Sequence, residues 1–294
     1  MSVFTGAAVA IVTPFKQNQE VDYEQFYKNI EFQIAHKTDA IVVCGTTGES
    51  STMSHEEHLD VIEACVKRVN GRVPVIAGTG SNSTAEAIHL STEAEKRGAD
   101  ALLLVSPYYN KSTQKGLFLH FKAIADSVNI PCILYNIPGR TGVNILPQTI
   151  VKLCTEVENI VGVKEATGDL AQTARLADLG RDKVDIYCGD DIMTLPFLSV
   201  GAKGVISVLS NIAPEEVHDM CEKFFDGKVA EAREMQLKAV KITDALFSEV
   251  NPIPIKKAMS YMGFCDDVYR APLCTMDETK AEALKEEMKN YGLL

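Results

Sequence analysis

The sequence has no basic clusters and no long apolar runs. Its 29 Lys and Arg residues are outnumbered by 40 Asp and Glu residues, which gives a formal net charge of −11. Nucleic acids and anionic membranes are bound through basic clusters, so neither is expected as a partner. No apolar run approaches the roughly 18 residues of a membrane span. An anionic substrate would have to be held by single positive side chains inside a pocket.

Signals for secretion and for cysteine-based metal sites are also missing. The first six residues lack the basic region and apolar run of a secretory signal. The eight cysteines form no C-x-x-C pair, and most lie in apolar contexts, where cysteine behaves as a small hydrophobic residue. We therefore expect a cytoplasmic protein with reduced thiols and with neither disulfides nor bound zinc.

Several catalytic signatures are excluded by their spacing. His55 and His58 lie three residues apart, whereas the H-E-x-x-H motif of zinc proteases needs four. The chain contains no G-x-S-x-G elbow, Walker loop or G-x-G-x-x-G fingerprint. The carboxylates of Asp190 and Asp191 have no histidine or third acid beside them in sequence, so we predict no metal site.

Eight short apolar runs recur through the first two-thirds of the chain. They cover residues 7–13, 40–44, 73–77, 101–105, 132–135, 160–164, 184–188 and 204–208. Each run is apolar on both faces, as parallel strands buried between two layers are. The starts lie roughly 20 to 33 residues apart, which is the length of a βα unit.

Helix signals fill the intervals between these runs. Ser54 and Ser83 each begin a capping box, Asp22 begins a looser one, and Pro147 and Pro214 suit first helical positions. Eight βα repeats without a linker predict a (β/α)₈ TIM barrel rather than an open doubly wound sheet. After about residue 225 only helices are indicated, at 228–247, 254–262 and 277–291. We expect a catalytic barrel over 1–225 and a C-terminal α-helical segment over 226–294 packed on it.

Polar motifs follow the predicted strands on one side of this barrel. The active site of such a barrel lies at the C-terminal ends of its strands, so these motifs should meet at one rim. They are Gly45-Thr-Thr-Gly-Glu-Ser50, Pro107-Tyr-Tyr-Asn110, Tyr135-Asn-Ile-Pro-Gly-Arg-Thr-Gly142, Lys164, Gly189-Asp-Asp191 and Ser210-Asn211.

Lys164 is the most informative of these residues because it interrupts an apolar strand. Burial disfavours the ammonium form and lowers the pKa of a lysine, which creates a nucleophilic amine near neutral pH. Such an amine forms Schiff bases with carbonyl substrates. The alternative is an edge-strand lysine that reaches back to solvent.

The neighbouring motifs suit the same chemistry. Gly45-Thr-Thr-Gly48 offers backbone N–H groups and two hydroxyls for a small carboxylate, although glycines also simply permit tight turns. Tyr135 is either a proton shuttle beside the lysine or a barrel filler. Arg140 matches a carboxylate with its planar fork, and we favour this role over a solvated loop charge.

Three motifs together resemble the class I pyruvate aldolase/lyase family. They are Gly45-Thr-Thr-Gly-Glu49, Tyr135-Asn-Ile-Pro-Gly-Arg-Thr-Gly142 and Val163-Lys-Glu-Ala-Thr-Gly168. The similarity runs from Gly6 to Leu294 and is greatest to the branch that condenses pyruvate with aspartate 4-semialdehyde, in diaminopimelate and lysine synthesis. N-acetylneuraminate lyase and keto-deoxy-sugar acid aldolases on the same barrel are the alternative, and Arg140 favours the semialdehyde. A pyruvate-binding sensor would be expected to have lost the lysine or the tyrosine.

The resemblance also implies roles for single residues. Lys164 would form an imine with pyruvate without any cofactor, and Tyr135 would shuttle protons through Thr47 to Tyr109 of a neighbouring subunit. Such sharing makes a dimer the smallest active unit, and the resemblance implies a homotetramer built as a dimer of dimers. The remaining substrate-binding positions are Thr46 and Thr47 for the pyruvate carboxylate, Arg140 for the semialdehyde carboxylate, and Gly189 and Ile206 in the pocket lining.

A feedback site for L-lysine is implied at a subunit interface. The matching positions are Ser50, His55, His58, Asn82, Glu86 and Tyr108. Glu86 could pair with an ammonium group, and the others offer hydrogen-bond partners. The alternative is that His55 and His58 are ordinary exposed residues of a helix's first turn.

Overall fold

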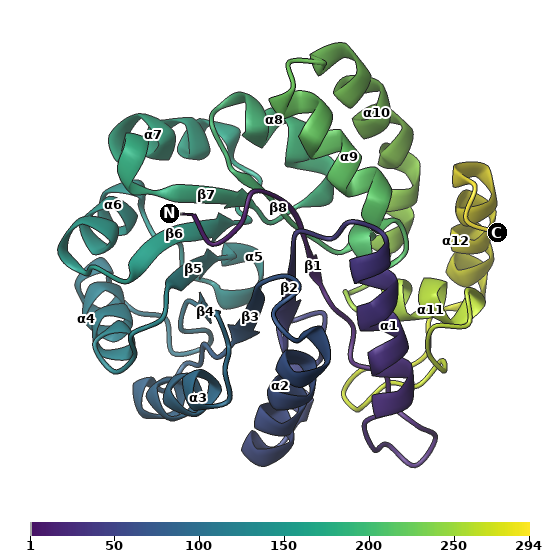
Figure 1. Ribbon diagram of the computed structural model, residues 1–294, viewed down its shortest axis with the longest axis horizontal. Coiled ribbons are helices and arrows are strands. Elements are labelled where there is room, and N and C mark those ends of the chain that lie inside the picture. The colour runs from purple at the N-terminus through teal and green to yellow at the C-terminus, as the bar shows by residue number, and fades with distance from the viewer. Residues whose placement is uncertain (1) are drawn as a thin grey trace.

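The computed structural model describes residues 2–294 and contains a closed eight-stranded parallel barrel (Figure 1). Neighbouring strands pair in chain order, and β8 pairs with β1 to close the ring. The strands are β1 (Gly6–Ala10), β2 (Ala40–Val43), β3 (Val75–Gly78), β4 (Ala101–Val105), β5 (Cys132–Asn136), β6 (Ile160–Glu165), β7 (Asp185–Cys188) and β8 (Gly204–Ser207). The predicted TIM barrel is confirmed.

Helices surround this barrel and continue beyond it (Figure 1). They are α1 (Tyr23–Ala35), α2 (His55–Val69), α3 (Thr84–Lys96), α4 (Gln114–Ala125), α5 (Pro138–Thr141), α6 (Pro147–Glu156), α7 (Leu170–Gly180), α8 (Thr194–Ser199), α9 (Pro214–Phe225), α10 (Val229–Leu246), α11 (Ile253–Tyr261) and α12 (Glu278–Tyr291). Short 3₁₀ turns are η1 (Ser50–Thr52), η2 (Arg181–Lys183), η3 (Asp191–Met193) and η4 (Leu209–Asn211). Within residues 2–294, none of the helices has the length and apolar character of a membrane span.

The predicted helix starts are confirmed at the atomic level. The side chain of Asp22 accepts a hydrogen bond from the third residue after it at 3.1 Å, and Ser54 does the same at 3.2 Å. The equivalent bond to Ser83 is 3.4 Å long. Each bond satisfies one of the backbone N–H groups that a helix leaves free in its first turn. Pro147 and Pro214 occupy first helical positions, where their missing N–H groups are not needed.

The first strand differs most from its prediction, since it ends at Ala10 rather than at residue 13. Beyond Ala10 the chain forms hydrogen bonds with the η4 turn that follows β8, instead of continuing the strand pairing with β8. The backbone N–H of Val12 donates to the side chain of Asn211 at 3.0 Å, and Asn211 in turn donates to the carbonyl of Ala10 at 2.8 Å. The side-chain amide of Asn211 therefore provides the hydrogen bonds to this segment where the strand pairing stops.

Two apolar layers hold the barrel together. One lies between the strands and the surrounding helices, and the other fills the inside of the barrel. At the N-terminal end of the barrel, Phe4 stacks on Tyr187 with ring centroids 4.4 Å apart, and the Tyr187 hydroxyl donates to the Phe4 carbonyl at 3.0 Å. Tyr135 and Ile206 belong to the same interior layer. The inside of the barrel is therefore a packed core.

The three C-terminal helices pack beside the barrel. α10 contacts α9 and α12, and α12 contacts α11, so that this group lies along the edge where the chain ends (Figure 1). The buried faces include Ile242 and Leu246 on α10 and Leu284 and Met288 on α12. The three helices confirm the predicted helical ranges to within one residue at each end, whereas the division into two units at residue 225 stays a prediction.

Gly204 generates a prediction about barrel closure. A Cβ at this position would overlap the backbone of Gly6 on β1, where β8 and β1 meet. We expect Gly204→Ala to lower the free energy of unfolding by about 1–3 kcal/mol, the usual cost of overpacking, measured by denaturant unfolding. Gly139→Ala is the matched control, because a Cβ there meets nothing within 4 Å. Equal stability of the two variants would contradict this account of closure.

Candidate active site

Lys164 and Tyr135 face each other inside the C-terminal rim. They occupy paired positions on the neighbouring strands β6 and β5, and each is only 6% exposed. The Lys164 Nζ lies 4.5 Å from the centre of the Tyr135 ring, within range of a cation–π contact. The edge-strand alternative for Lys164 is therefore wrong, because its side chain is enclosed rather than solvated.

Burial shifts both groups toward their neutral forms. It lowers the pKa of Lys164 to about 8, with a smaller contribution from Arg140, while the carboxylates of Asp191 and Asp190 oppose this change. A larger fraction of the amine is therefore unprotonated near neutral pH than in a solvated lysine. Burial also raises the pKa of Tyr135 to about 12, although Arg140 and a hydrogen bond with Thr46 act in the opposite direction. The phenol stays protonated beside an amine that is able to act as a nucleophile.

Gly189 leaves space for the Lys164 side chain. A Cβ at Gly189 would come within 3.1 Å of the Lys164 Cε and 2.7 Å of the Ala166 Cβ. The Gly189 N–H donates to the carbonyl of Glu165 at 2.9 Å, which fixes the end of β7 against β6. Ile206, 1% exposed, belongs to the interior layer with Tyr135. Both predicted lining residues thus lie near the lysine and tyrosine pair.

The residues that follow Tyr135 and Lys164 point outward and tie the two strands together. Asn136 donates to the buried carboxylate of Glu165 at 3.0 Å, and Gln172 donates to it at 3.3 Å. Burial raises the pKa of Glu165, while these hydrogen bonds favour its ionised form. We did not single out this pair from the sequence. The available signal in the sequence was a polar residue at the end of each of two neighbouring, otherwise apolar strands.

The Gly45–Ser50 loop is shaped by its own backbone and by a distant lysine. Turn hydrogen bonds run from Gly48 N–H to the carbonyl of Gly45 and from Glu49 N–H to that of Thr46, both at 3.1 Å. Glu49 has a φ of 54°, a conformation that L-residues rarely adopt. Its carboxylate forms an ion pair with Lys256 of α11, and both side chains are fully buried. The ion pair therefore holds the loop in an otherwise unfavourable conformation.

Aromatic rings and an arginine surround this ion pair. The Lys256 Nζ lies 4.4 Å from the centre of the Phe15 ring, and the Arg270 guanidinium carbon lies 4.1 Å from the centre of the same ring. The backbone N–H of Arg270 also donates to Glu49 at 3.3 Å, and its side chain pairs with Glu57. The buried carboxylate is thus compensated by a charge and by a hydrogen bond, as buried charges require.

Thr47 and Arg140 meet at a residue that sequence reasoning missed. The side chain of Asn251, between α10 and α11, donates to the Thr47 hydroxyl at 3.0 Å. Its backbone carbonyl accepts a hydrogen bond from Arg140, also at 3.0 Å. Tyr109, by contrast, is 92% exposed at the tip of the β4–α4 loop, so the predicted link from Thr47 to Tyr109 is not formed within one chain. Its completion by a neighbouring subunit stays a prediction.

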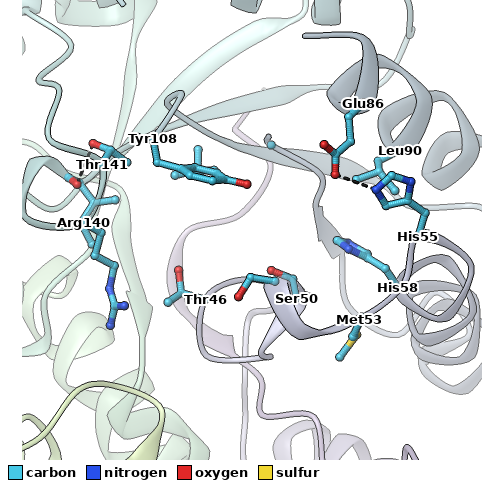
Figure 2. A pocket seen from close by; sticks show the side chains of 14 residues that line it. Thr46, Ser50, Met53, His55, His58, Glu86, Leu90, Tyr108, Arg140 and Thr141 are labelled. Atoms are coloured by element: carbon cyan, nitrogen blue, oxygen red, sulfur yellow. Dashed lines mark hydrogen bonds and ion pairs between the residues drawn. The ribbon is translucent and has the colours of Figure 1, made fainter. Parts of the chain in front are cut away.

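The predicted lysine-binding residues line a cavity beside the rim. Its volume is about 330 Å³, and Ser50, His55, His58, Glu86 and Tyr108 all contribute to its wall. Figure 2 shows Thr46 and Arg140 on one side of this cavity and the hydrogen-bonded His55 and Glu86 on the other. Asn82 does not line the cavity but donates to the carbonyl of Tyr108 at 3.2 Å.

The polar groups of this cavity are already engaged. Glu86 accepts a hydrogen bond from Ser81 at 2.9 Å and contacts His55 at 2.8 Å. His58 is 6% exposed, and its Nε2 contacts the carbonyl of Gly78 at 2.8 Å. Burial lowers the pKa of His58, so this ring favours its neutral form. His58 is therefore not the exposed helix residue that the alternative interpretation supposed.

The rim offers no cluster of metal ligands within residues 2–294. One group of suitable side chains, His218, Asp219 and Glu222, lies on α9. His218 contacts Asp39, which precedes β2 and therefore lies at the opposite end of the barrel. Asp219 is paired with Lys37 at 3.0 Å.

Comparison with known proteins identifies the family. Residues 3–291 match the model of the dihydrodipicolinate synthetase family. The chain belongs to this family. A 4-hydroxy-tetrahydrodipicolinate synthase from Lachnoclostridium phytofermentans is 54% identical over 294 residues, with all of both chains covered.

Solved structures of family members show the same fold. The dihydrodipicolinate synthase of Acinetobacter baumannii, complexed with pyruvate, is 45% identical with a TM-score of 0.97, and 99% of each chain is covered. That of Cyanidioschyzon merolae, with lysine bound, is 40% identical with a TM-score of 0.97, and all of both chains is covered. The family resemblance inferred from three motifs is confirmed over the whole chain.

The buried ion pair generates a prediction about stability. Lys256→Met leaves the Glu49 carboxylate buried without its partner, so we expect a loss of about 3–5 kcal/mol in the free energy of unfolding. Adding Glu49→Gln removes the uncompensated charge and should restore part of this loss. Denaturant unfolding of the single and double variants measures both steps. A double variant less stable than Lys256→Met alone would contradict the argument.

Proposed function

We propose that this chain condenses pyruvate with L-aspartate 4-semialdehyde to 4-hydroxy-tetrahydrodipicolinate, at the start of diaminopimelate and lysine synthesis. The observation that carries the proposal is an enclosed lysine with a pKa lowered to about 8 beside a protonated tyrosine, on the barrel of this family. No organic cofactor or metal is required, because an imine on Lys164 itself serves as the electron sink.

The reaction begins at the neutral amine of Lys164. It attacks the keto carbon of pyruvate, and loss of water from the adduct gives a protonated imine. This cation draws electrons from the adjacent methyl group, which loses a proton to give an enamine. The enamine carbon attacks the aldehyde of the second substrate, and hydrolysis of the imine or its displacement by the substrate's amine frees Lys164. Tyr135 delivers and removes protons in these steps, because its phenol stays protonated close to the amine.

The rim supplies positions for two carboxylates. Thr46 and Thr47 in the loop after β2 hold the pyruvate carboxylate with hydroxyl and backbone N–H groups. Arg140 holds the semialdehyde carboxylate, since its exposed position lets a planar guanidinium meet an incoming anion. Gly189 and Ile206 shape the remaining wall.

A neighbouring copy completes the site in this proposal. Tyr109 is 92% exposed with a φ of 68°, so a large aromatic side chain projects from a constrained loop without covering its own barrel. We propose that it enters the site of a second subunit and joins Thr47 and Tyr135, within a homotetramer in the cytoplasm. Exposed aromatic side chains held on fixed loops are typical anchors of interfaces.

L-lysine is proposed as an inhibitor that binds the cavity beside the rim. A relative of similar structure has been solved with lysine bound. Glu86 offers a carboxylate for an ammonium group, and Ser50, His55, His58, Asn82 and Tyr108 form or support the wall. Because Thr46 and Arg140 line the same cavity, a ligand there lies next to substrate-binding groups.

The first test uses Lys164→Ala with pyruvate and borohydride. The unaltered chain should gain the mass of a reduced pyruvate adduct, and the variant should neither gain it nor turn over the semialdehyde. The rate of adduct formation should rise as the pH increases to about 8 and then level off, because only the neutral amine attacks. Lys203→Ala, at the far end of the barrel, is the matched control. Undiminished turnover in Lys164→Ala would contradict the mechanism. Turnover of N-acetylmannosamine in place of the semialdehyde would keep the Lys164 imine but contradict the proposed acceptor.

The lysine cavity is tested with Glu86→Gln. This change keeps the shape of the side chain but removes the charge that would pair with an ammonium group, so the lysine concentration for half inhibition should rise about tenfold or more. Glu93→Gln on the same helix, where the carboxylate pairs with Lys96, is the control. Inhibition that is the same in both variants would place lysine elsewhere.

A further inference from the structure

We infer that Asn251 is a positioning residue that directs the hydroxyl proton of Thr47 and holds Arg140 in place, an inference that rests on the proposed function. Asn251 comes from the segment between α10 and α11, far in sequence from both partners. It is 7% exposed, and its two hydrogen bonds reach one residue from each of the two proposed carboxylate sites.

The side chain of Asn251 determines what the Thr47 hydroxyl can do. Its Nδ2 donates to the Thr47 Oγ1 at 3.0 Å. A hydroxyl has one proton and two lone pairs, so an oxygen that accepts from Asn251 keeps its proton for another partner. Thr47 is 3% exposed, and few other directions are open to it. The amide therefore leaves the Thr47 proton available to the tyrosine relay.

The backbone of Asn251 has a separate role at Arg140. Its carbonyl accepts from the Arg140 Nη2 at 3.0 Å, which uses one of the five N–H donors of the guanidinium. The other donors remain for a carboxylate. Because this contact is made by the backbone, a change of the Asn251 side chain leaves it in place and separates the two functions.

The effect of Asn251 on Thr47 depends on which way the Asn251 amide is turned. Within residues 2–294 the buried Oδ1 has no hydrogen-bond partner, while the Nδ2 has Thr47. Turning the amide over would make Thr47 donate to Oδ1 and would withdraw its proton from the relay. The two orientations therefore predict opposite effects on kcat when Asn251 is replaced by a residue that can only accept a hydrogen bond from Thr47.

The decisive experiment is a double-mutant cycle of Asn251→Ala with Thr47→Val. If Asn251 acts through the Thr47 hydroxyl, Asn251→Ala should lower kcat about tenfold in the unaltered chain, the effect of losing about 1.4 kcal/mol of oriented hydrogen bonding. In the Thr47→Val background it should cost nothing further. The KM for the semialdehyde should stay unchanged in Asn251→Ala, because Arg140 keeps its contact. Additive losses in the cycle would overturn the inference.

A second variant tests the direction of the hydrogen bond. In Asn251→Asp the ionised carboxylate only accepts, so Thr47 must donate to it, and kcat should fall at least as far as in Asn251→Ala. A rate equal to that of the unaltered chain would show that Thr47 already donates to Asn251 and would overturn the inference. Asn29→Ala is the matched control, since Asn29 is also buried but lies on α1 without side-chain partners within residues 2–294.

Adduct trapping separates this inference from the proposed function. All Asn251 variants should still form the borohydride-trapped pyruvate adduct on Lys164, because the amine and its surroundings are unchanged. An unaltered chain that forms no adduct would contradict the proposed function itself. Trapping in every variant, together with additive kcat losses, would contradict only the role of Asn251.

Discussion

The buried ion pair between Glu49 and Lys256 is the constraint on which the geometry of the rim depends. Removing two charges from water is costly, and their attraction offsets this cost only when both are well paired and hydrogen-bonded. Here the carboxylate is met by Lys256 and by the Arg270 N–H. The contact joins the loop after β2 to α11, across 207 residues of sequence. Because Glu49 lies only two residues after Thr47 in the same turn, the position of this carboxylate constrains where the Thr46 and Thr47 hydroxyls lie.

Burial inside the barrel produces the two complementary states that the chemistry requires. The same loss of solvent that lowers the pKa of Lys164 raises that of Tyr135, since in each case the charged form is disfavoured. An amine and a phenol placed at paired positions of β6 and β5 therefore both become neutral, one as a nucleophile and the other as a proton donor. Burial alone therefore favours the neutral form of both groups. The outward neighbours Asn136 and Glu165 keep the two strands in this register.

The sequence predicted the barrel well because its signals are local. Each strand is a short apolar run, and the caps at Asp22, Ser54 and Ser83 depend on residues only three positions apart. Lys164 was found for the same reason, as a charge inside such a run. Asn251 and Lys256 were missed because their partners lie 204 and 207 residues away, and no local pattern encodes such a contact. The available signal was a lysine within the apolar start of α11, comparable to the signal at Lys164.

These distant contacts give the C-terminal segment a structural role beyond packing beside the barrel. Its helix α10 packs against α9 as part of an appended group would, but the segment also reaches the rim through Asn251 and Lys256. A barrel positions side chains well at strand ends, whereas its loops are free to move unless something outside holds them. The two loops that carry Thr47 and Arg140 are both held by this segment. The positions of Thr47 and Arg140, the two residues proposed to hold the substrate carboxylates, therefore depend on chain that lies outside the eight βα units.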